Sequence, residues 1–569
     1  MIKLRGTEIP PLSGEMRRCA ENVKYFRGAA ALTGNRVLRN ERITEQYGGT
    51  SGASRFLLYM GIRRRKQSVR FFGRRAGLRT DEKYCYTVFV YIKITDVRTT
   101  CGNIEVTLFI LEHEREVNTL KYTFRGGVRL DEHKYTADCE TEIITPPDTV
   151  SIPMSQHIGA PCVPLVSVGD HVFLGQKIGD VEGGLGCPVH ASVSGTVTAI
   201  DEKSSPSGAR IKNIVISNDK KNELSPDIKP FPKRLTETTD DELISVIREA
   251  GVTGMGGASF PTYAKIASAA GKVEQMIINC AECEPFITAN HRLLVEDPAS
   301  VINGIKILLR AVGVRSAIIA VEDNKLDAVN ILEEMLSRSR MISVAVMKTK
   351  YPQGDERQLV YALTGRELRQ GQLPADAGCV IFNAETCAAV FRAFAKGMPL
   401  VSRRVTVSGD CVAEPKNLLV PIGTPFSSLV DYCGGLSKKP KYMISGGPMM
   451  GQAQWDKDAP VVKGTSALLV LSESFAKLPS TPPVCIRCGR CVAHCPMRLM
   501  PNYIALFSSN GEFDKAEKYG AMSCVECGTC SYGCPAGVPI VQHIRVAKGE
   551  IRAAAAQKKA AMTKSESGK

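Results

Sequence analysis

The chain has 569 residues, of which 44% are hydrophobic and 23% are charged, and its formal net charge is +15. This composition is ordinary for a globular protein, and the length predicts about four domains. The sequence holds no run of about 18 or more apolar residues, so we expect no membrane-spanning helix. The N-terminus also lacks the compact apolar region of a secretory signal.

Residues 1–119 are assigned to no domain. Their apolar residues follow neither a helical nor a strand period, and a basic run lies at 63–66. No nucleic-acid-binding motif accompanies this run, so we expect no nucleic-acid partner. Two interpretations stay open: the segment is a disordered extension, or it results from a mis-annotated start codon upstream of the native one.

A small β barrel is predicted for residues 120–220. Apolar and polar residues alternate in short runs between glycines, as in V-G-D-x-V-x-x-G-Q-x-I at 168–178. This pattern and the S-G-T-V that follows resemble the hammerhead of lipoyl and biotinyl domains. No lysine stands at the hairpin tip, so we expect no attached cofactor. We interpret His157 and His190 as structural residues of the barrel.

Residues 233–400 are predicted to form an α/β domain. Apolar, β-branched runs typical of buried parallel strands alternate with amphipathic helical patterns. The strand runs lie at 276–279 and 316–321, and the helical patterns lie at 240–250, 297–312 and 326–338. Residues 401–445 then change to short strands and turns, which predicts a separate β module. The glycine-rich loop at 446–451 has no assigned chemistry.

A glycine-rich turn precedes a predicted helix at 262–270. It reads Gly251-Val-Thr-Gly254-Met-Gly256-Gly257-Ala-Ser-Phe-Pro261. Such a turn presents backbone N–H groups at the positive end of a helix dipole, which is a common way to bind phosphate. The turn matches neither the P-loop pattern nor a clean G-x-G-x-x-G, so nucleotide hydrolysis is not favoured. Taken alone, a tight turn without a ligand stays open.

Eight cysteines near the C-terminus form two copies of one pattern, C-x-x-C-x-x-C-x-x-x-C-P. This is the spacing of two-cluster ferredoxins, in which the fourth cysteine of each run binds the other cluster. Residues 476–545 are therefore predicted to hold two [4Fe–4S] clusters. One cluster is assigned Cys485, Cys488, Cys491 and Cys534, and the other is assigned Cys524, Cys527, Cys530 and Cys495. Structural zinc is the alternative, because C-x-x-C pairs also bind Zn²⁺. Residues 546–569 are predicted to be a basic, flexible tail.

Four motifs in the α/β region resemble the NADH-oxidising flavoprotein subunit of respiratory complex I. They are G-x-G-G-A-x-F-P at 254–261, the segment from Asn279 to Pro285, G-D-E at 354–356, and I-F-N-A-E-T at 381–386. The resemblance implies an FMN and NADH site. It implies that Gly254, Gly256 and Gly257 present backbone to the FMN phosphate and that Lys265 reaches it. Asn279 and Asn383 are implied to hydrogen-bond the flavin, and Glu282 and Glu284 to line the nicotinamide side as catalytic residues. One acidic position of the family is Ala281 here.

The whole of residues 120–545 resembles the RnfC family, whose members belong to Rnf electron-transport complexes. The barrel, the flavin motifs, the module at 401–445, which resembles a soluble-ligand-binding β-grasp, and the double cysteine run occur together in it. The resemblance implies a component of an ion-translocating ferredoxin:NAD⁺ oxidoreductase with two [4Fe–4S] clusters, FMN and NAD(H). Implied partners are the other Rnf subunits and ferredoxin, reached directly or through another subunit. The implied location is the cytoplasmic face of the cell membrane. The family's early histidine is Arg129 here.

Two other functions stay open at this point. A soluble NADH-dependent reductase, such as a cobalamin reductase, resembles the same architecture. A non-catalytic electron carrier would keep the clusters and lose the flavin, although the intact loop at 254–261 argues against it.

Overall fold

The computed structural model describes residues 122–257, 259–475 and 483–567, together with the backbone of four strands between residues 56 and 115. The chain forms two compact units, Met1–Thr119 and Leu120–Lys569. In the first unit the four strands pair in the order β1-β2-β3-β4, and all neighbours are antiparallel. They are β1 (Phe56–Gly61), β2 (Val69–Arg75), β3 (Cys85–Ile92) and β4 (Leu108–Arg115).

We expect residues 1–118 to be dispensable for the second unit. The first unit is a separate compact unit, and every motif with predicted chemistry lies after Leu120. A chain that starts at Lys121 is expected to fold and to bind the same amounts of flavin and iron as the full-length chain, as measured by absorbance and metal analysis. A loss of either cofactor would contradict this expectation. Abundant native peptides from 36–79 would show that the first unit is expressed.

The second unit begins with a barrel made of two small sheets. Their orders are β6-β12-β11-β8 and β10-β9-β7. The strands are β6 (Thr149–Pro153), β7 (Val163–Pro164), β8 (His171–Val172), β9 (Lys177–Asp180), β10 (Val189–His190), β11 (Gly195–Ser204) and β12 (Arg210–Asn218). Alternate residues face a common apolar core that includes Val150, Ile178 and Ile216. His157 and His190 are buried beside this core, as we expect of structural histidines.

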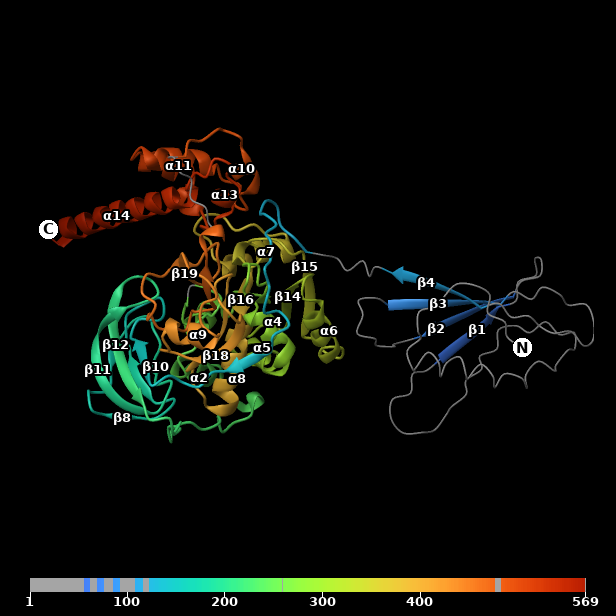
Figure 1. The fold of residues 1–569 in the computed structure, drawn as a ribbon, viewed down its shortest axis with the longest axis horizontal. Helices are drawn as coiled ribbons and strands as arrows, with labels where there is room; N and C mark the ends of the chain where they lie inside the picture. Colours follow the sequence, from blue (N-terminus) through green and yellow to red (C-terminus); the bar gives the residue numbers. More distant parts are fainter. Residues whose placement is uncertain are drawn as a thin grey trace, which may run out of the picture. The chain divides into compact units, whose positions relative to one another are not determined.

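A four-stranded parallel sheet lies at the centre of the second unit (Figure 1). Its order is β15-β14-β13-β16, and its helices are connected to it in the manner of an α/β fold. The strands are β13 (Gln275–Cys280), β14 (Ala317–Glu322), β15 (Ile342–Met347) and β16 (Cys379–Asn383). The helices are α2 (Asp240–Glu249), α3 (Thr262–Ala269), α4 (Ala289–Glu296), α5 (Pro298–Val312), α6 (Leu326–Met335), α7 (Glu356–Thr364) and α8 (Ala384–Lys396), with 3-10 turns η2 (Leu235–Glu237) and η3 (Pro374–Ala377).

The two faces of this sheet bury different side chains, because successive residues of a strand point to opposite sides. Met276 and Ile278 of β13 pack in the large core with α2, α3, α5 and α8, and Ile277 packs on the other face with α7. Helices α5 and α8 approach closely at Gly304, where a Cβ would lie only 1.8 Å from the carbonyl oxygen of Cys387. Any larger residue at Gly304 would push these helices apart.

A six-stranded mixed sheet corresponds to the predicted β module. Its order is β20-β19-β21-β17-β18-β5. Its elements are β5 (Thr141–Ile143), β17 (Ser402–Ser408), β18 (Lys416–Pro421), α9 (Phe426–Tyr432), β19 (Tyr442–Ser445), β20 (Gln452–Ala453), β21 (Ala467–Leu471) and the 3-10 turn η4 (Glu473–Phe475). Strand β5 was predicted to lie in the 120–220 barrel region, but it pairs in parallel with β18 of this sheet. Tyr122 and Val128 likewise bridge to Met347 and Tyr351 of the α/β domain.

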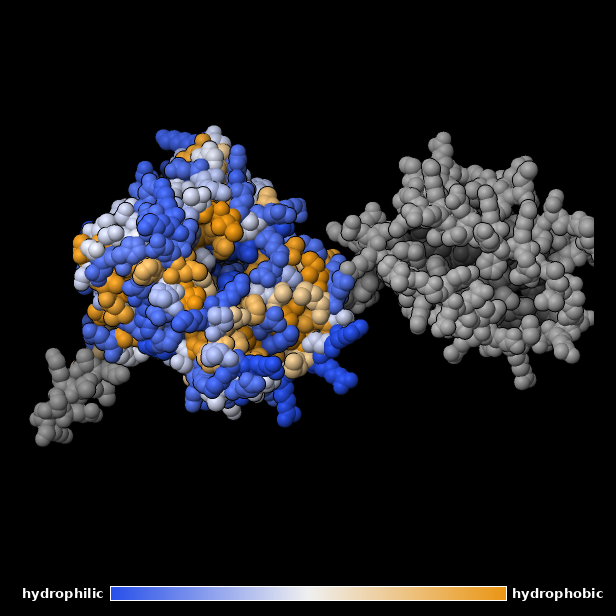
Figure 2. Space-filling model, turned by 90° about the horizontal axis from the view of Figure 1, so that it is seen from below, coloured by the Kyte–Doolittle hydropathy of each residue, from blue (hydrophilic) through white to orange (hydrophobic). Residues whose placement is uncertain are grey.

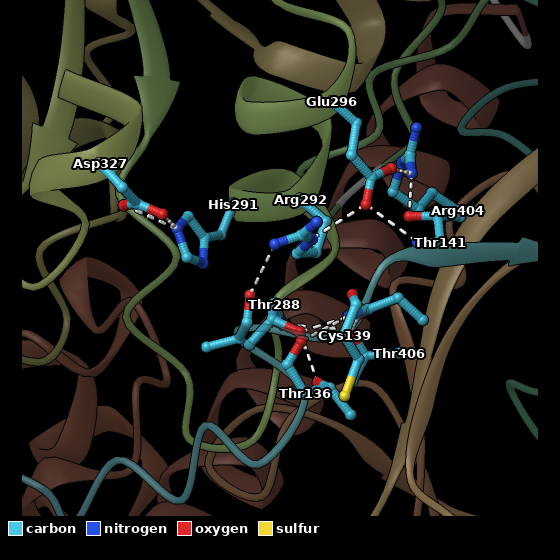
Figure 3. A network of polar contacts seen from close by, with 12 residues as sticks. Thr136, Cys139, Thr141, Thr288, His291, Arg292, Glu296, Asp327, Arg404 and Thr406 are labelled. Atoms are coloured by element: carbon cyan, nitrogen blue, oxygen red, sulfur yellow. Dashed lines mark hydrogen bonds and ion pairs between the residues drawn. The ribbon is translucent and has the colours of Figure 1, made fainter. Parts of the chain in front are cut away.

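Buried polar contacts join this early segment to α4 and β17 (Figure 3). The Glu296 carboxylate accepts hydrogen bonds from the Arg292 side chain at 2.9 Å and from Arg404 at 2.7 Å. Thr288, just before α4, contacts the hydroxyl of Thr136 at 2.5 Å, and its backbone N–H donates to Thr406 at 3.1 Å. Since buried polar groups are costly unless paired, this network specifies how the 122–143 segment passes over the sheet.

The predicted cluster region is a small group of helices, which lies at one end of the second unit in Figure 1. The helices are α10 (Arg490–His494), α11 (Pro501–Ser509), α12 (Phe513–Lys518), α13 (Thr529–Tyr532) and α14 (Ile540–Ser567), with the 3-10 turn η5 (Ala521–Ser523). Helix α14 continues through most of the predicted flexible tail, because the Ala-rich stretch favours helix. No helix among the described residues is long and apolar enough to cross a membrane.

The outer surface of the second unit is mixed in character. Figure 2 shows one face on which apolar residues gather in several patches between hydrophilic ones. Exposed large apolar side chains include Trp455, Val484 and Ile486. Val484 and Ile486 are the neighbours of Cys485 in the sequence, so the loop that carries this predicted cluster ligand has exposed apolar surface.

Candidate functional site

The predicted flavin residues meet where the strand order of the α/β sheet reverses. Strands β13, β14 and β15 follow one another in one direction, and β16 returns to the other side of β13. Asn279 and Asn383 stand opposite each other at the carboxyl ends of β13 and β16. In open α/β sheets ligands bind in the crevice at this reversal, because the two outgoing loops diverge there.

The glycine-rich turn lies against the same strand ends. A Cβ on Gly256 would lie 3.3 Å from the Cβ of Asn383, which leaves no room for a larger side chain. Gly257 has φ +145°, a conformation that favours glycine, and a Cβ there would meet no protein atom within 4 Å. A Cβ on Gly254 would meet only the Phe260 backbone, with its carbonyl oxygen at an ordinary 3.5 Å. Open space beside bare backbone at Gly257 fits a phosphate, and Gly254 is the least constrained of the three.

Three side chains from distant parts of the chain hold this turn. The Thr386 hydroxyl accepts a hydrogen bond from the N–H of Met255 at 3.0 Å, and Arg403 donates to the carbonyl of Met255 at 2.8 Å. Lys463, which is fully buried, donates to the carbonyl of Gly251 at 2.7 Å. Arg403 and Lys463 belong to the β module, so that module orients the turn. Thr386 ends the predicted motif at 381–386, although no role was predicted for it, and no sequence pattern near Arg403 or Lys463 indicates their contacts.

The other predicted flavin ligands are partly engaged within the protein. The Asn279 side chain donates to the carbonyl of Gly354 at 2.8 Å and accepts from the N–H of Ala281. The Asn383 oxygen caps α8 by accepting from the N–H of Glu385 at 3.0 Å. Lys265 forms an ion pair with Glu356 at 2.6 Å. These contacts bring the four sequence motifs to one place, and direct binding of flavin by the three side chains stays a prediction.

The two predicted catalytic glutamates do different things in the structure. The buried Glu282 carboxylate accepts from the N–H groups of Asn290 and His291, so it caps the N-terminus of α4. The Glu284 carboxylate accepts from the N–H groups of Met449 and Met450 at 3.0 and 2.9 Å. Glu284 therefore orients the glycine-rich loop at 446–451, for which the sequence indicated no role. Contact of either glutamate with nicotinamide stays a prediction.

Burial raises the pKa of Glu284 to about 7, although the N–H groups of Met449 and Met450 oppose this shift. The folded protein thus binds a proton more tightly than the unfolded chain, and its free energy of unfolding falls as pH rises from about 4.5 to about 7. We expect Glu284→Gln, which has no titrating group, to remove this slope, which amounts to about 1–3 kcal/mol between about pH 4.5 and about pH 7. Denaturant unfolding of the cofactor-loaded protein at several pH values measures this, with exposed Glu182→Gln as control. An unchanged slope would contradict it.

The second cysteine run is largely shielded from solvent, with Cys527 and Cys530 buried and Cys524 half-buried. Burial is the main cause that raises the pKa of the Cys524, Cys527 and Cys530 thiols, and the charge of Cys495 adds to each shift. Cys495 is therefore close enough to this run for its charge to act on all three thiols, and the exchanged-ligand assignment stays a prediction. N–H groups of Leu499 and Glu526 point at the sulfurs of Cys495 and Cys524, at 3.4 and 3.3 Å. Four soft thiol donors with N–H···S bonds fit an iron–sulfur cluster.

The first cysteine run lies nearer to solvent. Cys485 and Cys488 are exposed, while Cys491 is buried in the helical core of the region. Cys534 packs partly against the same core. Cys485 and Cys488 would place one side of the predicted second cluster toward solvent, and the pairing of Cys534 with this run stays a prediction.

A short turn joins the crevice between β13 and β16 to the loop of the second cysteine run. The buried Tyr351 hydroxyl donates to the carbonyl of Cys527 at 2.7 Å, and three residues later the carbonyl of Gly354 accepts from Asn279. Cys527 also packs with Met449, whose N–H is held by Glu284. Two loops of the α/β and β modules thus contact the loop that carries Cys527.

Comparison with protein-family models gives four matches in chain order. Residues 122–221 match the RnfC barrel sandwich hybrid domain, and residues 247–392 match the Nuo51 FMN-binding domain. Residues 404–453 match the SLBB domain, and residues 484–538 match the 4Fe-4S dicluster domain. These matches confirm the predicted fold class, with FMN and [4Fe–4S] clusters as cofactors.

Three curated relatives, each the C component of its complex, align with most of the chain. The relative from the Na(+)-translocating ferredoxin:NAD(+) oxidoreductase complex of Acetobacterium woodii is 45% identical over 76% of this chain and 98% of its own length. Its proton-translocating counterpart from Clostridium ljungdahlii is 42% identical over 77% and 96%. The relative from the ion-translocating oxidoreductase complex of Rhodobacter capsulatus is 38% identical over 76% and 83%.

The chain is also similar to a solved NAD⁺-reducing [NiFe]-hydrogenase in the H2-reduced state, with 18% identity and a TM-score of 0.40 over 55% of this chain and 61% of that one. A likeness this weak does not bear on function. The curated relatives are components of ion-translocating oxidoreductase complexes, so they do not favour the soluble cobalamin reductase. From their identity and coverage, and from the RnfC domain at 122–221, the chain belongs to the RnfC family of ion-translocating ferredoxin:NAD(+) oxidoreductase complexes.

Proposed function

We propose that this chain exchanges electrons with NADH at a flavin held between β13 and β16. The cluster of Cys495, Cys524, Cys527 and Cys530, here called the inner cluster, then exchanges electrons with the flavin. The turn from Tyr351 to Gly354 carries the proposal, because it contacts both the loop of Cys527 and the side chain of Asn279. FMN supplies the two-electron to one-electron conversion that a nicotinamide donor and a cubane acceptor require. The other cluster, here called the outer cluster, lies farther along the electron path and includes the exposed Cys485 and Cys488.

In this proposal the protein groups position the cofactors and exclude water. The backbone at Gly256 and Gly257 holds the phosphate end, and Asn279 and Asn383 set the width of the crevice between the strand ends. Glu284 holds the loop at 446–451 against the cluster loop, where a Cβ on Gly528 would lie 3.2 Å from the Met449 carbonyl oxygen. Such close packing of loops shortens the separation between redox centres.

A visible spectrum of the purified protein tests this function directly. We expect a flavin band together with broad iron–sulfur absorption, and NADH added without oxygen should bleach both. If NADH bleaches the clusters of a protein that contains no flavin, electrons do not enter through a flavin, and the proposal is wrong. A flavin that NADH does not bleach would point to a flavoprotein with another electron donor.

Partners and location are part of the proposal. The relatives' names, which specify a complex, ferredoxin and NAD(+), support other complex subunits, ferredoxin and NADH as partners. Exposed Val484 and Ile486 flank Cys485, which provides apolar surface for a partner beside the outer cluster. We further propose attachment to the cytoplasmic face of the cell membrane through another subunit.

Salt extraction of membranes tests this mode of attachment. An interface of packed apolar groups resists moderate salt, whereas attachment by surface charge is screened, with a Debye length of about 10 Å at 0.1 M. We expect the protein to stay in the membrane fraction in moderate salt, also after deletion of residues 552–569, which follow the last core residue of α14. A protein found only in the soluble fraction, in cells that make the other subunits, would contradict it.

A further inference from the structure

A cavity opens at the carboxyl ends of β13, β14 and β15, apart from the crevice between β13 and β16 that is proposed for the flavin. Its volume is about 350 Å³, and residues 129–134 form part of its wall together with loops at 282–285, 322–324 and 348–351. Apart from Glu282, none of the residues predicted for the flavin and nicotinamide site lines it. Small-molecule sites have volumes of about 300–1,000 Å³, so this cavity is large enough for a small ligand.

Three cationic side chains converge on this cavity: Arg129, Lys348 and Lys350. Burial lowers the pKa of Lys350, and the charges of Lys348 and Arg129 lower it further, so these charges repel that of Lys350. Lys350 donates to the carbonyl of Phe124 at 3.1 Å and lies over its ring. Neighbouring cations that repel one another are costly unless an anion joins them.

The glutamates of the cavity wall have other partners. Glu322 pairs with the buried Lys325 at 2.9 Å, and Glu282 caps α4. Glu132 accepts from the side chain of Asn324 at 2.5 Å. Asp323, the fourth acid of the wall, accepts from the N–H and the hydroxyl of Thr349 at 2.9 and 2.6 Å. Each of these four carboxylates therefore has at least one partner other than Arg129, Lys348 and Lys350.

Lys134 is a fourth cation in the wall, and it is already satisfied. Its ammonium group donates to three backbone carbonyls, those of Glu282, Glu284 and Ile287, at 2.6–2.8 Å. An ammonium group has three donors, so none is left for a ligand. The donors that can serve a ligand are those of the three converging cations.

We propose that this cavity binds a small phosphate-bearing anion, held by Arg129, Lys348 and Lys350 and distinct from the flavin. A phosphate monoester carries about −1.5 to −2 charge at neutral pH and three acceptor oxygens, which match three cationic donors better than one carboxylate does. The location agrees with the general preference of ligands for the carboxyl end of parallel strands. Tyr351 lines the cavity and bonds the loop of Cys527, so the ligand lies beside the inner cluster loop.

Calorimetric titration of the flavin- and cluster-loaded protein tests the proposal, with inorganic phosphate and ADP as probes at low ionic strength. We expect saturable binding of at least one probe. Lys348→Gln and Lys350→Gln should each weaken it about tenfold or more, as expected for loss of a hydrogen bond to a charged group. Lys306→Gln removes one charge from the exposed face of α5, away from the cavity, and should leave the affinity unchanged.

Two further measurements separate this site from its alternatives. Cofactor content and melting temperature identify a variant that fails to fold, and the other lysine variant then decides. Gly256→Val protein, expected to lack flavin, should still bind the probe, and loss of binding there would place the anion in the flavin crevice and overturn the proposal. It is equally overturned if neither probe binds, or if both lysine variants bind normally.

Discussion

Gly256→Val and Gly257→Val are each expected to abolish flavin binding and NADH–ferricyanide reductase activity while both clusters remain. At Gly256 the added side chain would meet Asn383, which already lies 3.3 Å from the position of a Cβ. At Gly257 it would enter the open space proposed for phosphate and would also strain a backbone with φ +145°. Flavin released by acid, iron content and activity are the measurements.

The glycines of the chain provide matched controls for this prediction. Gly183, in the barrel, has open space around it and no positive φ, so Gly183→Val should keep normal flavin and activity. Gly254→Ala is expected to retain most of the flavin, because its Cβ makes only an ordinary contact. Normal flavin content in both valine variants of the turn would show that the turn does not bind FMN.

Cys527→Ser is expected to remove about half of the iron and to stop reduction of the remaining cluster by NADH. The wild-type protein should hold about eight iron and eight sulfide per chain, because two cubanes hold four of each. Cys527 belongs to the loop that Tyr351 and Met449 contact, so its cluster is proposed as the one next to the flavin. Its loss leaves only the outer cluster, farther from the electron donor.

Cys488→Ser is the matched control, since it removes the outer cluster instead. It should lose the same amount of iron, yet NADH should still reduce the inner cluster and ferricyanide activity should persist. Low-temperature electron paramagnetic resonance after NADH addition distinguishes the two variants. If NADH reduces the cluster that remains in each variant equally fast, the proposed order of the clusters is wrong. If zinc is the dominant metal in the protein, the iron–sulfur assignment is wrong.

Much of this protein could be predicted from local sequence patterns. The cysteine spacing indicates iron–sulfur chemistry because a loop of fixed length must wrap one cluster. The β-branched runs at 276–279 and 316–321 became the parallel strands β13 and β14, since a strand buried on both faces must be apolar throughout. The helix predicted at 262–270 is α3, which begins directly after Pro261.

Only the tertiary structure decided which distant residues support the site. Lys463 donates to the carbonyl of Gly251 from 212 residues away, a contact that no local pattern indicates. Strand β5 joins the β module although the barrel lies between them in the sequence. The converging cations of the cavity proposed for the anion come from 129 and from 348–350. Such contacts depend on how the domains pack. Each polar side chain could bond to many partners, and only the packing of the domains determines which of them it meets, so a local sequence pattern cannot predict the contact.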